Sequence, residues 1–160
     1  MIDRIVGFTG SRAGITDAQK RIVTKMLGMI RPVEAHHGEC VGADAMFHEI
    51  VREALPECHI IGHPPLYNST LWARLAGYYR EEDPLPYLER DRSIVEACGI
   101  LIGCPKIGRR FTNLVDRATS KYGNQYRSGT WYTINYALKM GKEVVIVNPD
   151  GTIDRTEAKK

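Results

Sequence analysis

Five short strand-like runs, four of them largely apolar, alternate with segments of helical periodicity, and this alternation limits the fold more than any other feature of the chain. The runs cover residues 4–9, 34–37, 58–62, 99–104 and 143–148. The run at 99–104 is apolar throughout, which is typical of a strand buried on both faces in a parallel sheet. Strands that alternate with helices form α/β domains in which helices cover both faces of the sheet. The sequence therefore predicts a three-layer α/β sandwich with a five-stranded, mainly parallel sheet.

The segments between these runs give the domain plan. Apolar residues recur at helical spacing in four segments, which begin near residues 17, 42, 87 and 129. Residues 66–86 have weak periodicity and predict mostly loop with a short helix near 71–77. We expect one domain over residues 1–150, in which 106–127 form a variable basic insertion, followed by a polar C-terminal tail at 151–160.

Composition narrows the class of protein. A chain of 160 residues has the usual size of one domain, and its net charge of +3 is too small to indicate bulk electrostatic binding of nucleic acid. Its four cysteines form no CxxC pair, which predicts reduced thiols. No apolar run approaches the roughly 18 residues that a membrane span requires. We expect a cytoplasmic protein without a membrane partner.

Turn residues with polar neighbours follow the predicted strands. Because ligands of open α/β sheets bind beyond the carboxyl ends of the strands, we expect these residues to converge on one site. In chain order, the candidates are Gly10, Ser11, Arg12, Gly38, Gly42, Ala43, Asp44, His63, Pro64, Ser128, Gly129 and Thr130.

The chemistry of these candidates suits an anion. Gly10 permits a tight turn whose N–H groups can face a phosphate, and Arg12 offers a bidentate donor. Residues 128–130 open a helix, where free N–H groups and the helix dipole favour negative charge. The alternative is a purely structural role, in a turn or a helix cap for Gly10 and Gly129 and as a solvated surface residue for Arg12. Asp44 can interact favourably with the helix dipole as a carboxylate at the helix N-terminus, accept a hydrogen bond from a ribose hydroxyl, or do both.

The histidines do not show the spacing of a metal site. His36, His37 and His48 have no carboxylate or cysteine at ligand spacing, so we interpret them as structural. We therefore expect no metal and no cofactor.

The basic segment at 106–127 allows several interpretations. It includes Arg109 and Arg110, and it can be a solvated loop, a lid over phosphates, or a track for single-stranded nucleic acid. In the last case Trp72, Tyr78, Tyr79 or Tyr126 would stack on bases.

The order of these pieces resembles the SLOG superfamily, a Rossmann-like group that includes the DNA-processing protein DprA and the LOG phosphoribohydrolases. The resemblance rests on residues 10–12, 37–44, 63–64, 87–92, 101–105 and 128–130 and is strongest to small stand-alone bacterial or phage members. It implies the strand order 3-2-1-4-5 and a ligand that is a nucleotide or a nucleotide derivative. It also implies that Arg90 and Asp91 belong to the site, and it suggests a homodimer with an interface near residues 78–79.

One position departs from the LOG pattern. The LOG enzymes carry Gly-Gly-x-Gly-Thr-x-x-Glu, and here Gly129-Thr130 matches the Gly-Thr while Thr133 falls on the glutamate. A threonine cannot supply the carboxylate of that reaction. We therefore predict a nucleotide-binding protein with a sensor, carrier or sequestering role. The alternatives are an N-glycoside hydrolase or ribosyl transferase acting on nucleoside monophosphates, with Asp91, Asp44 or Asp116 as its carboxylate, and a DprA-like binder of single-stranded nucleic acid.

Overall fold

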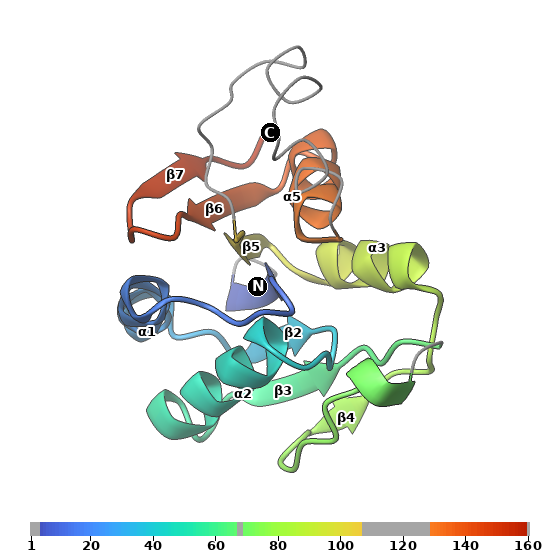
Figure 1. Cartoon of the computed structure of the whole chain (residues 1–160). Helices are drawn as coiled ribbons and strands as arrows, with labels where there is room; N and C mark the ends of the chain where they lie inside the picture. Colours follow the sequence, from blue (N-terminus) through green and yellow to red (C-terminus); the bar gives the residue numbers. More distant parts are fainter. Residues whose placement is uncertain (1–3, 67–68, 107–128, 160) are drawn as a thin grey trace.

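A largely parallel sheet runs through the centre of the molecule. The computed structural model describes residues 4–66, 69–106 and 129–159, and within them seven strands form one sheet in the order β4-β3-β2-β1-β5-β6-β7 (Figure 1). All neighbouring strands in it are parallel except β6 and β7, which are antiparallel. The strands are β1 (Ile5–Gly10), β2 (Glu34–His37), β3 (His59–Gly62), β4 (Arg80–Glu81), β5 (Ile100–Cys104), β6 (Glu143–Val147) and β7 (Ile153–Thr156).

The predicted count of five strands was wrong, and the order of the complete sheet differs from 3-2-1-4-5. The five predicted strands correspond to β1, β2, β3, β5 and β6, which lie together in the order β3-β2-β1-β5-β6. The sheet gains the short edge strands β4 and β7. β4 has two residues and β7 has mostly exposed side chains, so neither carries an apolar pattern that sequence analysis could detect. Residues 153–156, inside the predicted polar tail, pair with β6.

Helices cover both faces of the sheet. Two of them, α1 (Asp17–Ile30) and α2 (Ala43–Ala54), pack on one face, and α3 (Tyr87–Ala97) and α5 (Gly129–Lys139) pack on the other (Figure 1). The short helix predicted near residues 71–77 is instead a 3₁₀ turn, η2 (Ser69–Leu71), which lies slightly earlier in the chain. No helix among the described residues is long and apolar enough to cross a membrane.

Each face of the sheet has its own apolar core. On the face of α1 and α2, Phe8 of β1 stacks on Phe47 of α2 with ring centroids 4.3 Å apart. On the opposite face, Leu101 of β5 packs with Ile134 and other residues of α3 and α5. Alternate residues of β5 thus enter different cores, as the pleat of a strand requires. The four cysteines are free thiols, and three of them are buried. The two cores fix the positions from which the loops at the carboxyl ends of β1 and β5 project.

Candidate functional site

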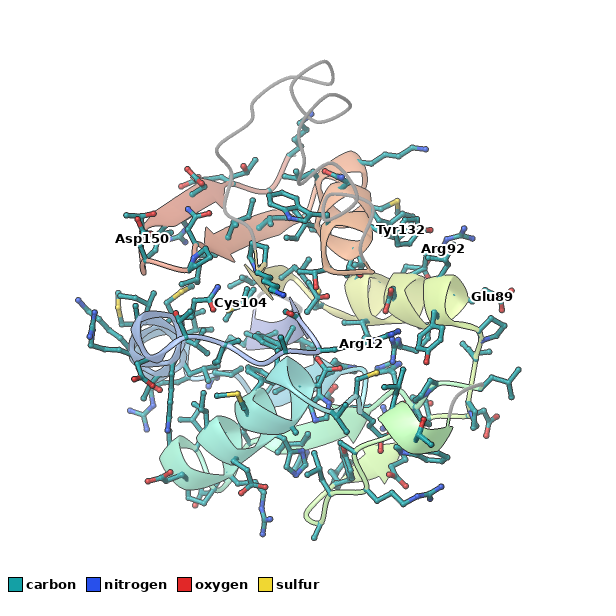
Figure 2. All side chains as sticks on the ribbon, in the orientation of Figure 1. Arg12, Glu89, Arg92, Cys104, Tyr132 and Asp150 are labelled. Carbon is teal, nitrogen blue, oxygen red and sulfur yellow. The ribbon has the colours of Figure 1, made fainter. Side chains whose placement is uncertain are left out.

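A cavity of about 400 Å³ lies at the carboxyl end of β1, bordered by the start of α2, by α3 and by the first turn of α5. Figure 2 shows Arg12 at this edge of the sheet, between α2 and α3. Nine of the predicted site residues line the cavity: Gly10, Ser11, Arg12, Gly38, Asp44, Arg90, Asp91, Gly129 and Thr130.

The loop after β1 is fastened to the start of α2. The Ser11 carbonyl accepts the N–H of Ala43 at 2.9 Å and that of Gly14 at 3.0 Å. Gly42, the N-cap of α2, has φ +89°, and a Cβ there would stand 2.1 Å from the carbonyl oxygen of Arg12. Only glycine fits this conformation and this close approach. Gly42 and Ala43 therefore support the cavity from behind and do not line it.

Arg12 points its charge into the open side of the cavity. Its side chain is exposed, and its guanidinium carbon lies 5.1 Å from the centre of the Tyr87 ring. Within the described part of the chain, it forms no ion pair with a carboxylate. A guanidinium in this position can donate to a phosphate or a carboxylate without first breaking an ion pair to another described residue.

Arg90 is instead engaged with the protein. It is 6% exposed, its Nε donates to Asp91 at 2.8 Å, and its Nη1 donates to the carbonyls of Gly38 and His63. A Cβ on Gly38 would stand 2.4 Å from Nη1 and 2.7 Å from the guanidinium carbon, so the absence of a side chain there makes room for the guanidinium. Arg90 thus holds the loop after β2 against α3, and its first task is structural.

Two buried carboxylates face the same cavity. Asp44 is 8% exposed and accepts the N–H of Cys40 at 3.2 Å, while Asp91 is 6% exposed and pairs with Arg90. Burial raises the pKa of Asp44 to about 6, although the positive charge of Arg90 opposes the change. Burial also raises the pKa of Asp91, against the effects of Arg90 and Thr133. The cavity therefore holds two carboxyl groups that accept a proton more readily than an exposed aspartate.

The first turn of α5 closes the cavity beside Asp91. Gly129, Thr130 and Trp131 line the wall, and a Cβ on Gly129 would stand 3.7 Å from Oδ2 of Asp91. The hydroxyl of Thr133 donates to the Gly129 carbonyl at 2.7 Å. The side chain at the position of the LOG glutamate thus closes the helix turn, and Asp91 supplies a carboxylate nearby. Two other predicted residues, Ser128 and Asp116, lie outside the described residues, as does the basic segment after Lys106.

Two predicted residues, His63 and Pro64, do not line the cavity. The His63 ring is paired with His36, because Nε2 of His63 lies 2.8 Å from Nδ1 of His36. Only the backbone carbonyl of His63 reaches Arg90. The carbonyl of Pro64 accepts the N–H of Leu85 at 3.3 Å. Both residues thus take part in the packing that surrounds the loop after β3.

His36 with His63 and His37 with His48 form two buried pairs next to the cavity, together called the histidine network. The Glu39 N–H donates to Nδ1 of His37 at 3.0 Å, so His37 carries its proton on Nε2 and donates it to Nδ1 of His48 at 2.9 Å. His48 then donates from Nε2 to the Ala76 carbonyl at 2.7 Å. Burial lowers the pKa of all four histidines. Among the described residues, no group of three or more potential ligands is arranged to hold a metal ion.

Sequence analysis missed several residues at or near the site. Tyr87 lies beneath both Arg12 and Arg90, and Cys40 receives a contact from Arg90 at 3.6 Å. The spacing of Tyr87 to Arg90, three positions apart on one helix, is a signal that could have identified the tyrosine. Glu39 carries no such signal. It is fully buried at φ +54°, and burial together with a neighbouring carboxylate raises its pKa to about 8.

Three of the aromatic residues proposed for base stacking are engaged within the fold, and Tyr126 lies outside the described residues. Tyr78 packs against His48 with ring centroids 4.6 Å apart, and Tyr79 stacks on His59 at 3.8 Å. The Trp72 ring is covered by Arg74, whose guanidinium carbon lies 4.2 Å from its centroid. Tyr79 remains 61% exposed.

Solved structures share this fold. A molybdenum cofactor binding protein from the phototrophic bacterium Rippkaea orientalis matches with a TM-score of 0.62 and 20% identity over 90% of this chain and 76% of its own. DNA processing protein A (DprA) from Streptococcus pneumoniae matches with a TM-score of 0.57 and 18% identity over 88% of this chain, which spans about half (49%) of DprA. TM1055, a structural-genomics target, matches with a TM-score of 0.53 and 15% identity over 88% of this chain and 71% of its own.

The likeness to these structures is one of fold, and DprA among them is one of the proteins to which the sequence was predicted to be similar. No family model and no curated protein sequence matches the chain. Sequence identities of 15–20% show that the fold is shared and do not indicate an activity.

Proposed function

We propose that this protein binds a nucleotide or a nucleotide derivative in the cavity at the carboxyl end of β1, in a sensor, carrier or sequestering role. The observation that carries the proposal is the convergence of Arg12, the first turn of α5 and two buried carboxylates on one cavity. Its volume of about 400 Å³ falls within the range of small-molecule sites.

The charges of the cavity suit a ligand with an anionic end. Arg12 and Lys106 line it and are both exposed, so a phosphate could reach them from solvent. Among the described residues, Arg12 has no ion pair that would have to break before it binds that phosphate. The position of the cavity, beyond the end of the central strand of an open α/β sheet, is the usual ligand position in such folds.

The names of two structural neighbours agree with ligand binding in this fold. One is a molybdenum cofactor binding protein and the other is DNA processing protein A. Their ligands differ, so the ligand of this chain has to be inferred from its own cavity.

Thermal unfolding in the presence of nucleotides tests the proposal. We expect at least one compound among nucleoside mono- and diphosphates and ADP-ribose, at millimolar concentration, to stabilise the protein by about 1–3 kcal/mol if it binds with micromolar affinity. The Arg12→Ala variant should lose most of this effect. The matched control is Arg92→Ala, because Arg92 lies on α3 outside the cavity and is bonded to Tyr132 at 2.8 Å (Figure 2). No stabilisation by any of these compounds would refute the proposal.

A second candidate is cleavage of the N-glycosidic bond of a nucleoside monophosphate. Its support is the position of Asp91, whose carboxyl group has a raised pKa and lies beside the first turn of α5. The LOG pattern has its glutamate one turn further along this helix, at the position of Thr133. A buried carboxyl group of this kind can act as a general acid or base. Incubation of the protein with AMP, followed by chromatography, tests this candidate. Release of free adenine that is lost in Asp91→Asn would support it, and the absence of free base would exclude it for AMP.

A further inference from the structure

Arg12 is carried by a fastened loop, but its side chain is not held by an ion pair. The Ser11 carbonyl accepts the N–H groups of Gly14 and Ala43. The Ser11 hydroxyl accepts the N–H of Ala13 at 3.1 Å, so the backbone on both sides of Arg12 is fixed. Among the described residues, no carboxylate pairs with the exposed guanidinium of Arg12. An arginine side chain that is free to rotate loses conformational entropy when it binds a ligand, and this loss weakens binding.

The ring of Tyr87 is placed to restrict that rotation. Tyr87 is the first residue of α3, and the guanidinium carbon of Arg12 lies 5.1 Å from the centre of its ring. This contact joins the loop after β1 to the start of α3, and both residues line the cavity. The face of an aromatic ring carries partial negative charge and attracts a cation at this distance. The ring can therefore orient the guanidinium without taking the place of an anionic ligand.

The ring of Tyr87 also lies against a second arginine, Arg90, three residues further along the helix. The guanidinium carbon of Arg90 lies 5.3 Å from the ring centre. Arg90 is 6% exposed and is bonded to Asp91 and to two backbone carbonyls, so its position is fixed. Its charge is balanced by Asp91 at 2.8 Å, which reduces its repulsion of Arg12. The same tyrosine thus contacts one arginine that is buried and paired and one that faces the open side of the cavity.

We propose that Tyr87 is a positioning residue that holds the guanidinium of Arg12 at the open side of the cavity, in the orientation that receives the anionic end of the ligand. The inference rests on the proposed nucleotide-binding function and specifies how the cation of that site is oriented before the ligand arrives. An aromatic ring provides this contact, whereas an aliphatic side chain does not. Tyr87→Phe should therefore preserve the effect, and Tyr87→Leu should remove it.

Side-chain dynamics in the absence of ligand test the contact directly. The probe is the order parameter of the Arg12 Nε–H group, measured by NMR relaxation on the full chain. Arg21, an exposed arginine of α1, is the comparison within the same molecule. We expect Arg12 to be more ordered than Arg21 in the native chain and in Tyr87→Phe, and as mobile as Arg21 in Tyr87→Leu. Tyr87→Met, which also lacks a ring, replaces Tyr87→Leu if that variant unfolds.

Calorimetric titration then connects the contact to binding, with AMP and adenosine as probes. In Tyr87→Leu the affinity for AMP should fall about two- to fivefold, as expected for the loss of an exposed cation–π contact, and in Tyr87→Phe it should be unchanged. Adenosine has no phosphate, so it should bind the native chain and both variants equally. In an Arg12→Ala background, Tyr87→Leu should have no further effect on AMP, because the two residues act through one contact.

Tyr132→Leu is the matched control. Tyr132 of α5 also contacts an arginine of α3, because its hydroxyl accepts a hydrogen bond from Nε of Arg92 at 2.8 Å, but neither residue lines the cavity (Figure 2). This variant should leave both the order parameter of Arg12 and the affinity for AMP unchanged.

The outcomes separate this inference from the proposed function. Equal order of Arg12 in the native chain and in Tyr87→Leu would overturn the inference, whether or not AMP binds. A loss of affinity that is equal for AMP and adenosine, or that persists in the Arg12→Ala background, would show that Tyr87 acts on the ligand by itself and would also overturn it. If the order of Arg12 depends on the ring but neither compound binds, the held orientation of Arg12 stands and the proposed function fails for these ligands.

Discussion

The cavity and the buried histidine network lie side by side at the carboxyl ends of the strands, but their polar side chains are used in opposite ways. In the network, both ring nitrogens of His37 and of His48 bond to protein partners. In the cavity, Arg12 has no ion pair among the described residues, and Asp44 and Asp91 line open space. The network completes its own hydrogen bonds, whereas the cavity leaves charge and acceptor positions for a ligand.

This difference arises within one stretch of chain. Along β2 and the loop after it, His37 bonds to His48 of α2, and the next residue, Gly38, lies against Arg90 of α3. Successive residues of a strand point to opposite faces of the sheet. A single step along the chain thus separates a structural side chain from a cavity wall. Polar character alone does not identify a functional residue, because its partners decide its role.

The largest effect should come from closing the space that Gly38 leaves for Arg90. In Gly38→Ala the new Cβ overlaps the guanidinium, which must move and leave Asp91 buried without its partner. Breaking a buried pair of this kind predicts a loss of about 3 kcal/mol in the free energy of unfolding, together with loss of nucleotide binding. Urea denaturation measures the first effect and calorimetry the second.

The matched control for that substitution is Gly28→Ala. Gly28 lies in α1, and a Cβ there would meet no atom within 4 Å. The control should raise stability by up to about 1 kcal/mol, as expected for alanine in an exposed helix position. Equal behaviour of the two variants would contradict the structural role of Arg90.

Breaking the histidine network should reduce stability without changing the site. His37→Phe leaves the Glu39 N–H and the His48 Nδ1 without their partner, which predicts a loss of about 2–3 kcal/mol at pH 7.5. Because the pKa of His37 is lowered in the fold, the native chain should lose stability as the pH falls below the ordinary value of 6.5. This loss should be smaller in the variant. Urea denaturation at pH 7.5 and pH 5.5 measures both effects. A weaker affinity of His37→Phe for AMP at pH 7.5, compared with the native chain, would show that the network and the cavity are coupled.

Glu39 should give the opposite dependence on pH. Its pKa is raised from 4.5 to about 8, so its contribution to stability is complete below pH 4.5 and is lost as the pH rises through about 8. Its Oε2 also has no hydrogen-bond partner in the part of the chain that the structure describes, so ionisation would place a poorly paired charge in the interior. Glu39→Gln should therefore be more stable than the native chain by about 1–2 kcal/mol at pH 9. Thermal unfolding at pH 6 and pH 9 tests this, and an equal difference at both values would rule out ionisation as its cause.

The smallest effect on the fold should come from Arg12. Arg12→Ala removes an exposed side chain, so unfolding should change by less than about 0.5 kcal/mol. Affinity for AMP should fall about tenfold, which corresponds to about 1.4 kcal/mol, because a charge-assisted contact to the phosphate is lost. Adenosine, which has no phosphate, should bind both proteins equally in a parallel titration. A similar loss for AMP and adenosine would show that Arg12 contacts another part of the ligand.

The central part of the fold was predictable because its signal is local. The strands β1, β3, β5 and β6 are largely apolar runs bounded by turn residues, and β2 is a short run ended by Gly38, so each was visible in the sequence. The edge strands were not visible, because β4 is two residues long and the side chains of β7 are mostly exposed. Such strands are defined by backbone pairing with a neighbour, which no single segment encodes.

The site was predictable at its glycines and less so at its partners. Residues 10–12 lie at the end of β1 and Asp44 lies in the first turn of the helix after β2, so their convergence followed from the rule for open α/β sheets. The pairing of His63 with His36, which removes its ring from the cavity wall, depends on side-chain packing between two strands. The position of Tyr87 beneath two arginines depends on how α3 packs on the sheet. These features required the three-dimensional structure.

The most direct test of the account is a crystal structure of the protein with AMP at saturating concentration. AMP should lie in the cavity, with its phosphate at Arg12. The histidine network should keep the same hydrogen bonds as in the free protein. AMP bound elsewhere on the molecule, with the cavity empty, would contradict the account.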